Sequence, residues 1–275
     1  MGKTEMKRSY QRRIWVFSRL AIIPLLVTIN CSNKPVLNIL SHAERLRDKG
    51  IYLEACEEYT KIIDRYPQSP LVADAFFQLG MTYYIYINDY NGAINIFNRL
   101  VSSCPDSRFS VTAQKHIAEI YMFKLMDFKK AIVEYQRILD NYPGTEKRDE
   151  CQYNIAQCYF HLYDFEQART EYVILLENFP STTLADDAYL QIAGSYYLEG
   201  HLEKALESYR EVIERFPETK ASIYAQFDIA GCLEELERLR EALNAYEGIL
   251  DKYEDKRVVQ VRIEKVKKRL KKRNK

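Results

Sequence analysis

Hydrophobic residues along most of this chain recur at intervals of three, four and seven positions, which places them on one face of an α-helix. This pattern returns every 37 or 38 residues between residues 37 and 254, and each period holds two such stretches. In the second stretch, an alanine is followed by an aromatic residue four positions later and by a proline twelve positions later. The alanines are Ala55, Ala93, Ala131, Ala168 and Ala205, the aromatic residues are Tyr59, Phe97, Tyr135, Tyr172 and Tyr209, and the prolines are Pro67, Pro105, Pro143, Pro180 and Pro217.

The first stretch of each period carries a small residue at a fixed place, and a hydroxyl residue follows each proline by two positions. A small residue lets two helices approach closely, and a serine or threonine hydroxyl can cap the exposed amides of a starting helix. We therefore expect the proline to end one helix and the hydroxyl residue to be the N-cap of the next. The small residues are Ala43, Gly80, Ala118, Ala156, Ala193 and Ala230, and the hydroxyl residues are Ser69, Ser107, Thr145, Thr182 and Thr219.

A single helical hairpin cannot bury its own apolar face, so neighbouring hairpins must stack on one another. The predicted fold is all-α: a right-handed α-solenoid of about six helical hairpins plus a C-terminal capping helix. The turns inside the hairpins are expected near residues 50, 88, 126, 163, 200 and 238. The predicted segments are a lipoprotein-type signal peptide at 1–30, a tether at 31–36, six repeats at 37–68, 69–106, 107–144, 145–181, 182–218 and 219–254, and a basic capping helix at 255–275.

The repeat resembles the tetratricopeptide repeat, which has a small-x-x-Tyr pattern in its first helix and Ala-x-x-x-Tyr/Phe followed by proline in its second. The usual repeat has about 34 residues, whereas this one is longer after the proline, as in YPQSPLVADA. That longer junction is similar to repeats in two envelope families, the BamD-type lipoprotein of outer-membrane β-barrel assembly and the Tol–Pal-associated cell-division coordinator. The resemblance implies a non-enzymatic scaffold for protein–protein interaction in β-barrel assembly. The alternative is a periplasmic or inner-membrane adaptor in cell-wall synthesis or division.

The resemblance also implies a binding surface, because the first helix of each tetratricopeptide repeat lines a concave groove that takes peptides. Aromatic residues are typical of binding hot spots, and several fall at these positions. Glu119, Glu234 and Glu235 would flank the groove and favour a neutral-to-basic ligand. The expected partners are other envelope proteins or peptide segments, with no small-molecule substrate. The groove positions are Phe77, Met81, Tyr84, Met122, Tyr153, Phe160, Leu190, Tyr197 and Phe227.

The N-terminal residues have the order of a secretory signal: basic residues, a short apolar run and a polar exit. The apolar run from Leu20 to Ile29 has ten residues and contains Pro24, whereas a membrane span needs about 20 apolar residues. The sequence therefore predicts export rather than a membrane-spanning helix.

The end of this run resembles a bacterial lipobox, in which signal removal leaves a lipid-modified cysteine at the N-terminus. The segment is Thr28-Ile29-Asn30-Cys31, although lipoboxes prefer Leu at the place of Thr28 and Gly, Ala or Ser at that of Asn30. Ser32 follows the cysteine, which resembles an outer-membrane destination. We expect lipidation at Cys31 and attachment to the outer membrane on its periplasmic side. The alternatives are an ordinary signal peptide or an uncleaved anchor, and a location at the inner membrane or in the periplasm.

Charge is distributed unevenly along the 275 residues. Residues 20–254 contain 23 basic and 36 acidic residues, whereas residues 255–275 contain 11 basic and 2 acidic ones. The acidic body argues against nucleic acid as the main partner, because phosphate contacts require lysine and arginine. The basic C-terminal segment is expected to cap the array, and the alternative is a basic arm that touches anionic lipid or an acidic partner.

No pattern in the chain points to catalysis, so we expect no enzyme activity and no cofactor. Cys151, Cys158 and His161 share a helix face, but a metal site needs more ligands than one helix offers, and we predict no metal. Cys151 and Cys158 lie about 10 Å apart along that helix, which exceeds disulfide reach. We expect these cysteines, with Cys56, Cys104 and Cys232, to be small buried apolar residues.

Overall fold

The structure is a computed structural model that describes residues 34–273. The predicted signal peptide and the predicted lipidation site Cys31 lie outside the described residues. Within 34–273 the chain is helical throughout its regular structure and contains no strand. The predicted all-α class is therefore confirmed.

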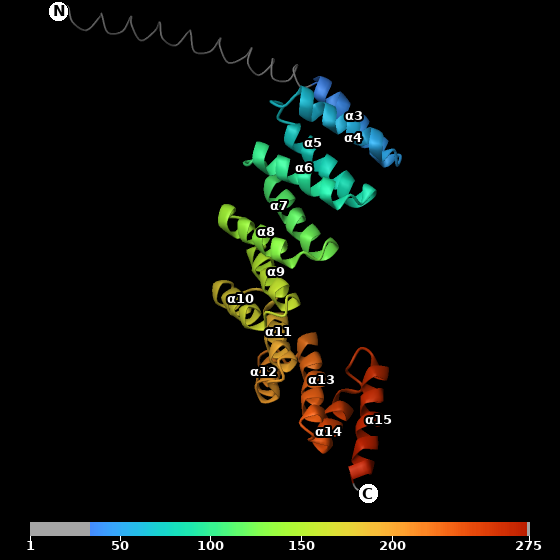
Figure 1. Cartoon of the computed structure of the whole chain (residues 1–275), viewed down its shortest axis with the longest axis vertical. Helices are drawn as coiled ribbons and strands as arrows, with labels where there is room; N and C mark the ends of the chain where they lie inside the picture. Colours follow the sequence, from blue (N-terminus) through green and yellow to red (C-terminus); the bar gives the residue numbers. More distant parts are fainter. Residues whose placement is uncertain (1–33, 274–275) are drawn as a thin grey trace, which may run out of the picture. The chain divides into compact units, whose positions relative to one another are not determined.

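Six helical hairpins follow one another along the chain, as predicted (Figure 1). The first three consist of α3 (Lys34–Asp48) with α4 (Tyr52–Arg65), α5 (Val72–Met81) and η1 (Thr82–Ile87) with α6 (Tyr90–Ser103), and α7 (Ser110–Glu119) and η2 (Ile120–Lys124) with α8 (Phe128–Asn141). The next three consist of α9 (Arg148–His161) with α10 (Phe165–Asn178), α11 (Ala185–Leu198) with α12 (Leu202–Arg215), and α13 (Lys220–Glu235) with α14 (Leu239–Ile249). A last helix, α15 (Lys256–Arg273), packs against α14. This is the predicted α-solenoid architecture with its C-terminal capping helix.

The chain divides into two compact units, Met1–Ile117 and Ala118–Lys275, which we call the first and second unit. The division falls inside α7. The first unit holds the hairpins of α3 to α6, and the second holds those of α8 to α15.

The core of both units is built from the repeated alanine and aromatic positions that define the period. The alanine of each second helix is completely buried, and the aromatic residue four positions later is buried beside it. Tyr59 and Phe97 fill this place in the first unit, and Tyr135, Tyr172, Tyr209 and Tyr246 fill it in the second. Burying an aromatic side chain of this size stabilises the fold by about 1.5–3 kcal/mol, so this position carries much of the packing energy in every hairpin.

The difference between 37- and 38-residue repeats has a structural explanation in two π-helical segments. The small residue of the first helix and the alanine of the second are thirteen positions apart in two hairpins, at Gly80 and Ala93 and at Ala118 and Ala131. In the other hairpins the separation is twelve. The two longer hairpins contain η1 and η2, where an i to i+5 hydrogen bond encloses one more residue per turn than an α-helix does. The extra residue is therefore absorbed at the end of the first helix.

The turns inside the hairpins lie where the period predicts them, and each contains a residue with positive φ. Only two of these residues are glycines, so four side chains adopt the left-handed conformation, which costs about 1–2 kcal/mol for a residue with a Cβ. The turn geometry is thus set by the packing of the two helices rather than by turn residues. The positive-φ residues are Gly50, Asn88, Met126, Tyr163, Gly200 and Glu237.

The predicted N-cap role of the hydroxyl residues is confirmed only at Thr219, whose Oγ1 accepts from the Ser222 amide at 3.4 Å. Ser69 and Thr182 instead accept from the amide two residues later, at 3.2 Å, and helices α5 and α11 begin three residues after them. Ser107 does the same with the Phe109 amide, whereas Thr145 donates to the Glu146 carbonyl. At the other four positions the prediction was wrong, because a short Ser or Thr side chain can form a hydrogen bond within the turn that precedes the helix.

Candidate peptide-binding faces

All nine residues predicted to line a groove lie on the first helix of their hairpins. Eight of them are partly buried, so each presents one side to its neighbours and keeps some surface exposed. In the first unit they are Phe77 and Met81 on α5 and Tyr84 on η1. In the second unit they are Met122 on η2, Tyr153 and Phe160 on α9, Leu190 and Tyr197 on α11, and Phe227 on α13.

Met122 departs from the expectation, because only 4% of it is exposed. The hydroxyl of Tyr135, buried on the second helix of the same hairpin, lies 3.8 Å from the Met122 sulfur, within weak hydrogen-bonding range. This contact holds the thioether in the core of the second unit. Met122 therefore does not belong to an open binding face.

The first unit carries a cluster of aromatic rings, which we call the aromatic cluster: Phe77, Tyr84 and His116 on first helices, Tyr90 at the start of α6 and Phe109 just before α7. Phe77 stacks on Phe109 with 4.9 Å between ring centroids. Tyr84 meets Tyr90 edge-on at 6.2 Å. Pairs in these arrangements contribute about 0.5–1.5 kcal/mol beyond their buried area. The rings predicted to bind are therefore held in fixed orientations.

His116 lies at the centre of this cluster, and sequence reasoning missed it. Its ring centroid lies 5.6 Å from that of Phe97, 5.9 Å from Tyr84 and 6.1 Å from Phe77. The sequence did contain a signal, because a polar residue stands two positions before the small residue of the first helix in every hairpin; it is Ser41 in the first hairpin and a larger side chain in the next five. We call these residues the polar row: Gln78, His116, Asn154, Gln191 and Asp228.

The polar row gives two buried tyrosines of the second unit, Tyr135 and Tyr209, a hydrogen-bond partner. The Tyr135 hydroxyl hydrogen-bonds to Asn154, and the Tyr209 hydroxyl hydrogen-bonds to Asp228. Each bond joins the second helix of one hairpin to the first helix of the next. A buried hydroxyl without a partner destabilises a fold, so these bonds stabilise the stacking of consecutive hairpins.

On α9 the two predicted groove residues are fixed by rings from α10. Tyr153 meets Tyr172 edge-on at 5.6 Å, and Phe160 meets Phe165 edge-on at 5.2 Å. Gln157, which lies between them on α9, donates to the hydroxyls of Tyr153 at 3.0 Å and Tyr172 at 2.7 Å. The face of α9 is thus mixed in character, with aromatic rings and one amide.

Further along the second unit, the face includes Leu190, Tyr197 and Phe227. Leu190 packs against the core cluster between α11 and α13. The ring centroid of Phe227 lies 5.4 Å from Tyr246 and 4.8 Å from Tyr253. These contacts leave part of each side chain exposed, so the face is apolar but firmly packed.

Tyr197 on α11 donates a short hydrogen bond to the carboxylate of Glu235 on α13. Burial raises the pKa of Tyr197, and the bond to the Glu235 carboxylate raises it further. The hydroxyl therefore stays protonated at neutral pH and remains a donor. This bond joins neighbouring first helices and places a negative charge on the face of the second unit.

The predicted acidic flank is only partly present, because Glu234 is not part of it. Its side chain is only 4% exposed and lies within 2.9 Å of both Lys265 and Arg269 on α15. The carboxylate that was expected to meet a ligand instead binds the capping helix. Glu235 is exposed, and Glu119 is partly buried.

Asp228 is the one carboxyl group of this face with a strongly shifted acidity. Burial raises its pKa to about 6, and the hydrogen bond from Tyr209 opposes part of that rise. A carboxyl group in this position loses its negative charge as the pH falls below 6. The electrostatic character of the face near α13 therefore depends on pH.

The five cysteines among the described residues are free, and four of them are buried, as predicted; Cys104 is partly buried. Burial raises the pKa of the Cys158 thiol to about 12, so it is unreactive at neutral pH. No group of three or more His, Cys, Asp or Glu in residues 34–273 is arranged to hold a metal ion. No described helix is both long enough and apolar enough to cross a membrane.

Comparison with known proteins supports the repeat assignment. Residues 74–107, 116–145, 150–182 and 187–219 each match the family model of the tetratricopeptide repeat. No curated protein sequence matches the chain. The fold is similar to that of a tetratricopeptide repeat protein from Parabacteroides merdae, with a TM-score of 0.56, 16% identity, and 84% of this chain and 86% of the other covered.

Two further solved structures have a similar fold. PilW, a type IV pilus biogenesis factor, aligns over 83% of this chain and 99% of its own with a TM-score of 0.50 and 16% identity. The apo form of RapI aligns over 85% of this chain and 75% of its own with a TM-score of 0.52 and 12% identity. At these identities the likeness establishes the fold.

Proposed function

Because the chain is built from tetratricopeptide repeats, we propose that it is a non-enzymatic scaffold that binds peptide segments of other proteins on the faces of its first helices. The observation that carries this proposal is the row of partly buried, firmly packed aromatic residues on those helices. Rigid aromatic side chains bind with little loss of conformational entropy, and they are enriched at binding hot spots. The face of the second unit also carries Glu235 and Asp228, which suits neutral or basic segments.

The finer proposal is that this scaffold acts at the bacterial cell envelope, as an outer-membrane lipoprotein of the BamD-like type in β-barrel assembly. Its support is the sequence: a basic N-terminal segment, a short apolar run, the lipobox-like Cys31 and the longer junction after each repeat proline. The alternative is a periplasmic or inner-membrane adaptor in cell-wall synthesis or division. The two differ in the membrane to which the chain is attached and in the partner that it binds.

Site-specific photocrosslinking in cells tests the binding face. A photoreactive amino acid is placed at Tyr153 or Phe160 on α9, and the matched control positions are Val133 and Val173, which are exposed on second helices. We expect a discrete crosslinked protein from the α9 positions and none from the control positions. Equal crosslinking from both sets would contradict binding on the first helices.

Lipid labelling tests the envelope assignment. Wild-type and Cys31→Ala chains are expressed with radioactive fatty acid, and the membranes are separated by density. We expect label and retention in the outer membrane for the wild type, and an unlabelled, uncleaved precursor for the variant. Equal processing without label in both would show that Cys31 is not lipidated, and label in the inner membrane would favour the adaptor.

A further inference from the structure

Helix α15 occupies the place of the first helix of a seventh hairpin. Its buried residues Val259, Ile263 and Val266 stand 187 positions after Val72, Phe76 and Leu79 of α5, a distance that equals five periods of 37 or 38 residues. At the place of the small residue Gly80 the helix has Lys267. Within residues 34–273 no second helix follows α15, so a long charged residue is tolerated at this place.

The cations next to the buried residues Val259, Ile263 and Val266 form ion pairs with carboxylates of the preceding hairpin. Lys265 and Arg269 pair with Glu234 at 2.9 Å, and Arg269 also pairs with Glu237 at 2.6 Å. Lys267 pairs with Glu247 at 2.7 Å. These pairs fix the rotation of α15 about its axis, so the opposite side of the helix is directed away from the hairpins.

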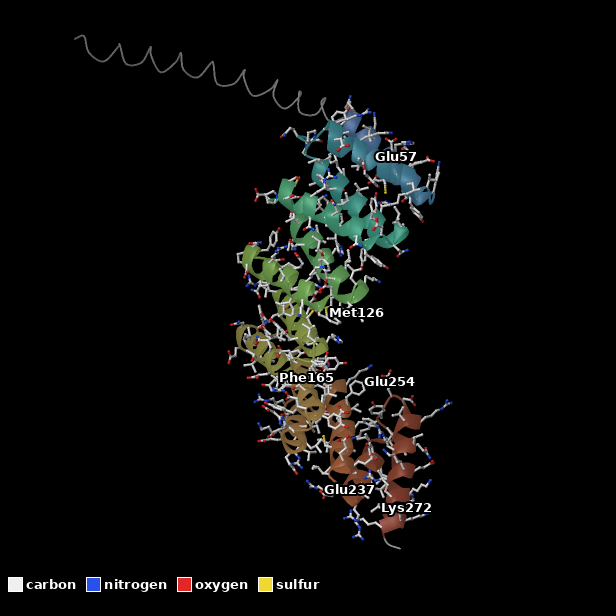
Figure 2. All side chains as sticks on the ribbon, in the orientation of Figure 1. Glu57, Met126, Phe165, Glu237, Glu254 and Lys272 are labelled. Atoms are coloured by element: carbon white, nitrogen blue, oxygen red, sulfur yellow. The ribbon has the colours of Figure 1, made fainter. Side chains whose placement is uncertain are left out.

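That opposite side carries Arg257, Val261, Lys268 and Lys272, which we call the outer row. Their spacing of four, seven and four residues keeps them within a narrow arc of the helix, on the side opposite Val259 and Val266. Within residues 34–273 the charged groups of these three cations form no ion pair or hydrogen bond, although the Arg257 backbone amide donates to Asp255, and all three side chains are exposed. Figure 2 shows Lys272 near the end of α15.

Apolar side chains are interleaved with these cations. Val261 is 63% exposed, and Val258 beside it is 42% exposed. The helix of 18 residues is about 27 Å long; the cations extend over most of this length, and the two exposed valines lie in its first two turns. Exposed cations with apolar residues between them, on a helix too polar to cross a bilayer, are typical of helices that lie on a membrane surface.

We propose that the outer row of α15 docks on an anionic phospholipid surface. The lysines and arginine meet lipid phosphates, each contributing about a fivefold gain in binding, and the two valines enter the headgroup layer. Lys271 lies at the edge of the row and adds a positive charge, while the exposed Glu264 lies on the same edge between Val261 and Lys268 and offsets one of them. The helix thus does more than cap the sixth hairpin, and it acts independently of any N-terminal lipid.

A nucleic acid is the less suitable occupant of this surface. A helix that contacts nucleic-acid phosphates gains nothing from exposed valines in the contact row. Residues 20–254 also contain 36 acidic against 23 basic residues, so a long nucleic acid that extended past α15 would be repelled by the rest of the chain. The lipid surface therefore fits both the charge and the apolar content of the row.

The test uses the full chain with Cys31→Ala, so that no acyl chain contributes, and measures co-sedimentation with vesicles. One vesicle type is phosphatidylcholine alone, and the other contains equal amounts of phosphatidylcholine and phosphatidylglycerol. The variant is Lys268→Gln with Lys271→Gln and Lys272→Gln. The control carries the same charge change at exposed lysines outside α15, namely Lys129→Gln, Lys204→Gln and Lys252→Gln.

We expect binding to the anionic vesicles only, weakened by about tenfold or more in the α15 variant and little changed in the control. The N-terminal basic residues are present in both, so their contribution cancels in the comparison. Equal affinities of the two variants, or equal binding to both vesicle types, would overturn the proposal. Displacement of the vesicles by a double-stranded DNA fragment at equal phosphate concentration would also overturn it, because the row would then prefer nucleic acid.

Discussion

The ring of Phe97 lies so close to Gly80 that a Cβ atom added to this glycine would come within 2.5 Å of ring atom Cε1 and 2.7 Å of Cδ1. The equivalent position is alanine in the other five hairpins. Gly80 has no unusual backbone angle, so the glycine is required by the approach of the ring and not by the chain conformation. The second hairpin is therefore packed more tightly at its helix crossing than its neighbours.

The first prediction compares Gly80→Ala with Gly231→Ala. At Gly80 the added methyl group must displace the Phe97 ring, and we expect a loss of about 1–3 kcal/mol in the free energy of unfolding. At Gly231 the nearest atom to the new Cβ is the Tyr246 hydroxyl at 3.8 Å. That is an ordinary contact, so alanine should stabilise its helix by about 0.5–1 kcal/mol. Urea denaturation measures both, and changes of the same sign would argue against this packing.

The second prediction concerns Met126, whose φ of 54° is in the left-handed region and whose side chain is exposed. Met126→Gly removes the steric cost of that conformation, whereas Met126→Ala keeps it. We expect the glycine variant to be about 1 kcal/mol more stable than the alanine variant, measured as thermal or urea unfolding. Equal stability of the two would mean that the turn does not hold this residue in the left-handed conformation.

The third prediction concerns the pH dependence of stability through Asp228. Its pKa in the folded chain is about 6, above the ordinary value of 3.8, so protonation favours the folded state. Its contribution to stability is therefore fully present below pH 3.8 and is lost as the pH rises through 6. Asp228→Asn cannot ionise and should be more stable than the wild type at pH 7 by about 1–3 kcal/mol.

This difference should shrink as the pH falls, because the wild-type side chain then becomes neutral as well. Melting temperatures of both chains at pH 4 and pH 7 measure it. If the variant and the wild type differed by the same amount at both values, Asp228 would not titrate in this range.

The fourth prediction concerns the anchoring of α15 by Glu234. Burial acts to raise the pKa of this carboxyl, but the hydrogen bonds from Lys265 and Arg269 outweigh burial and lower it. Glu234→Gln should destabilise the second unit by about 1.5–3 kcal/mol and speed amide exchange in α15. The effect should be full above pH 4.5 and fade as the pH falls below it, because the wild-type carboxylate is then protonated.

A matched control for this prediction is Glu247→Gln. Glu247 pairs with Lys267, but about half of each side chain is exposed. Exposed ion pairs contribute about 0–1 kcal/mol, so amide exchange in α15 should change little. Similar exchange rates in the two variants would show that Glu234 has no special role in holding the helix.

The period of the chain determined most of the fold. Turn residues such as Gly50 and Tyr163 were placed correctly, because each repeat restates the same local pattern of helix formers and breakers. The burial of Tyr135 and Ala131 followed from the same frame. The period also contained the signal for the π-helical segments, since the extra residue lies between Gly80 and Ala93, although the sequence alone did not show which helical form would absorb it.

The tertiary structure alone decided which side chains stay on the binding faces. Met122 has the same place in the repeat as Phe160, yet the hydroxyl of Tyr135 holds it in the core. Glu234 was expected to flank the groove beside Glu235, yet it is buried by a helix that lies about thirty residues further along the chain. Local periodicity determines which residues form a helix and which face is apolar. The partner of each individual side chain depends on contacts between distant segments, which that periodicity does not contain.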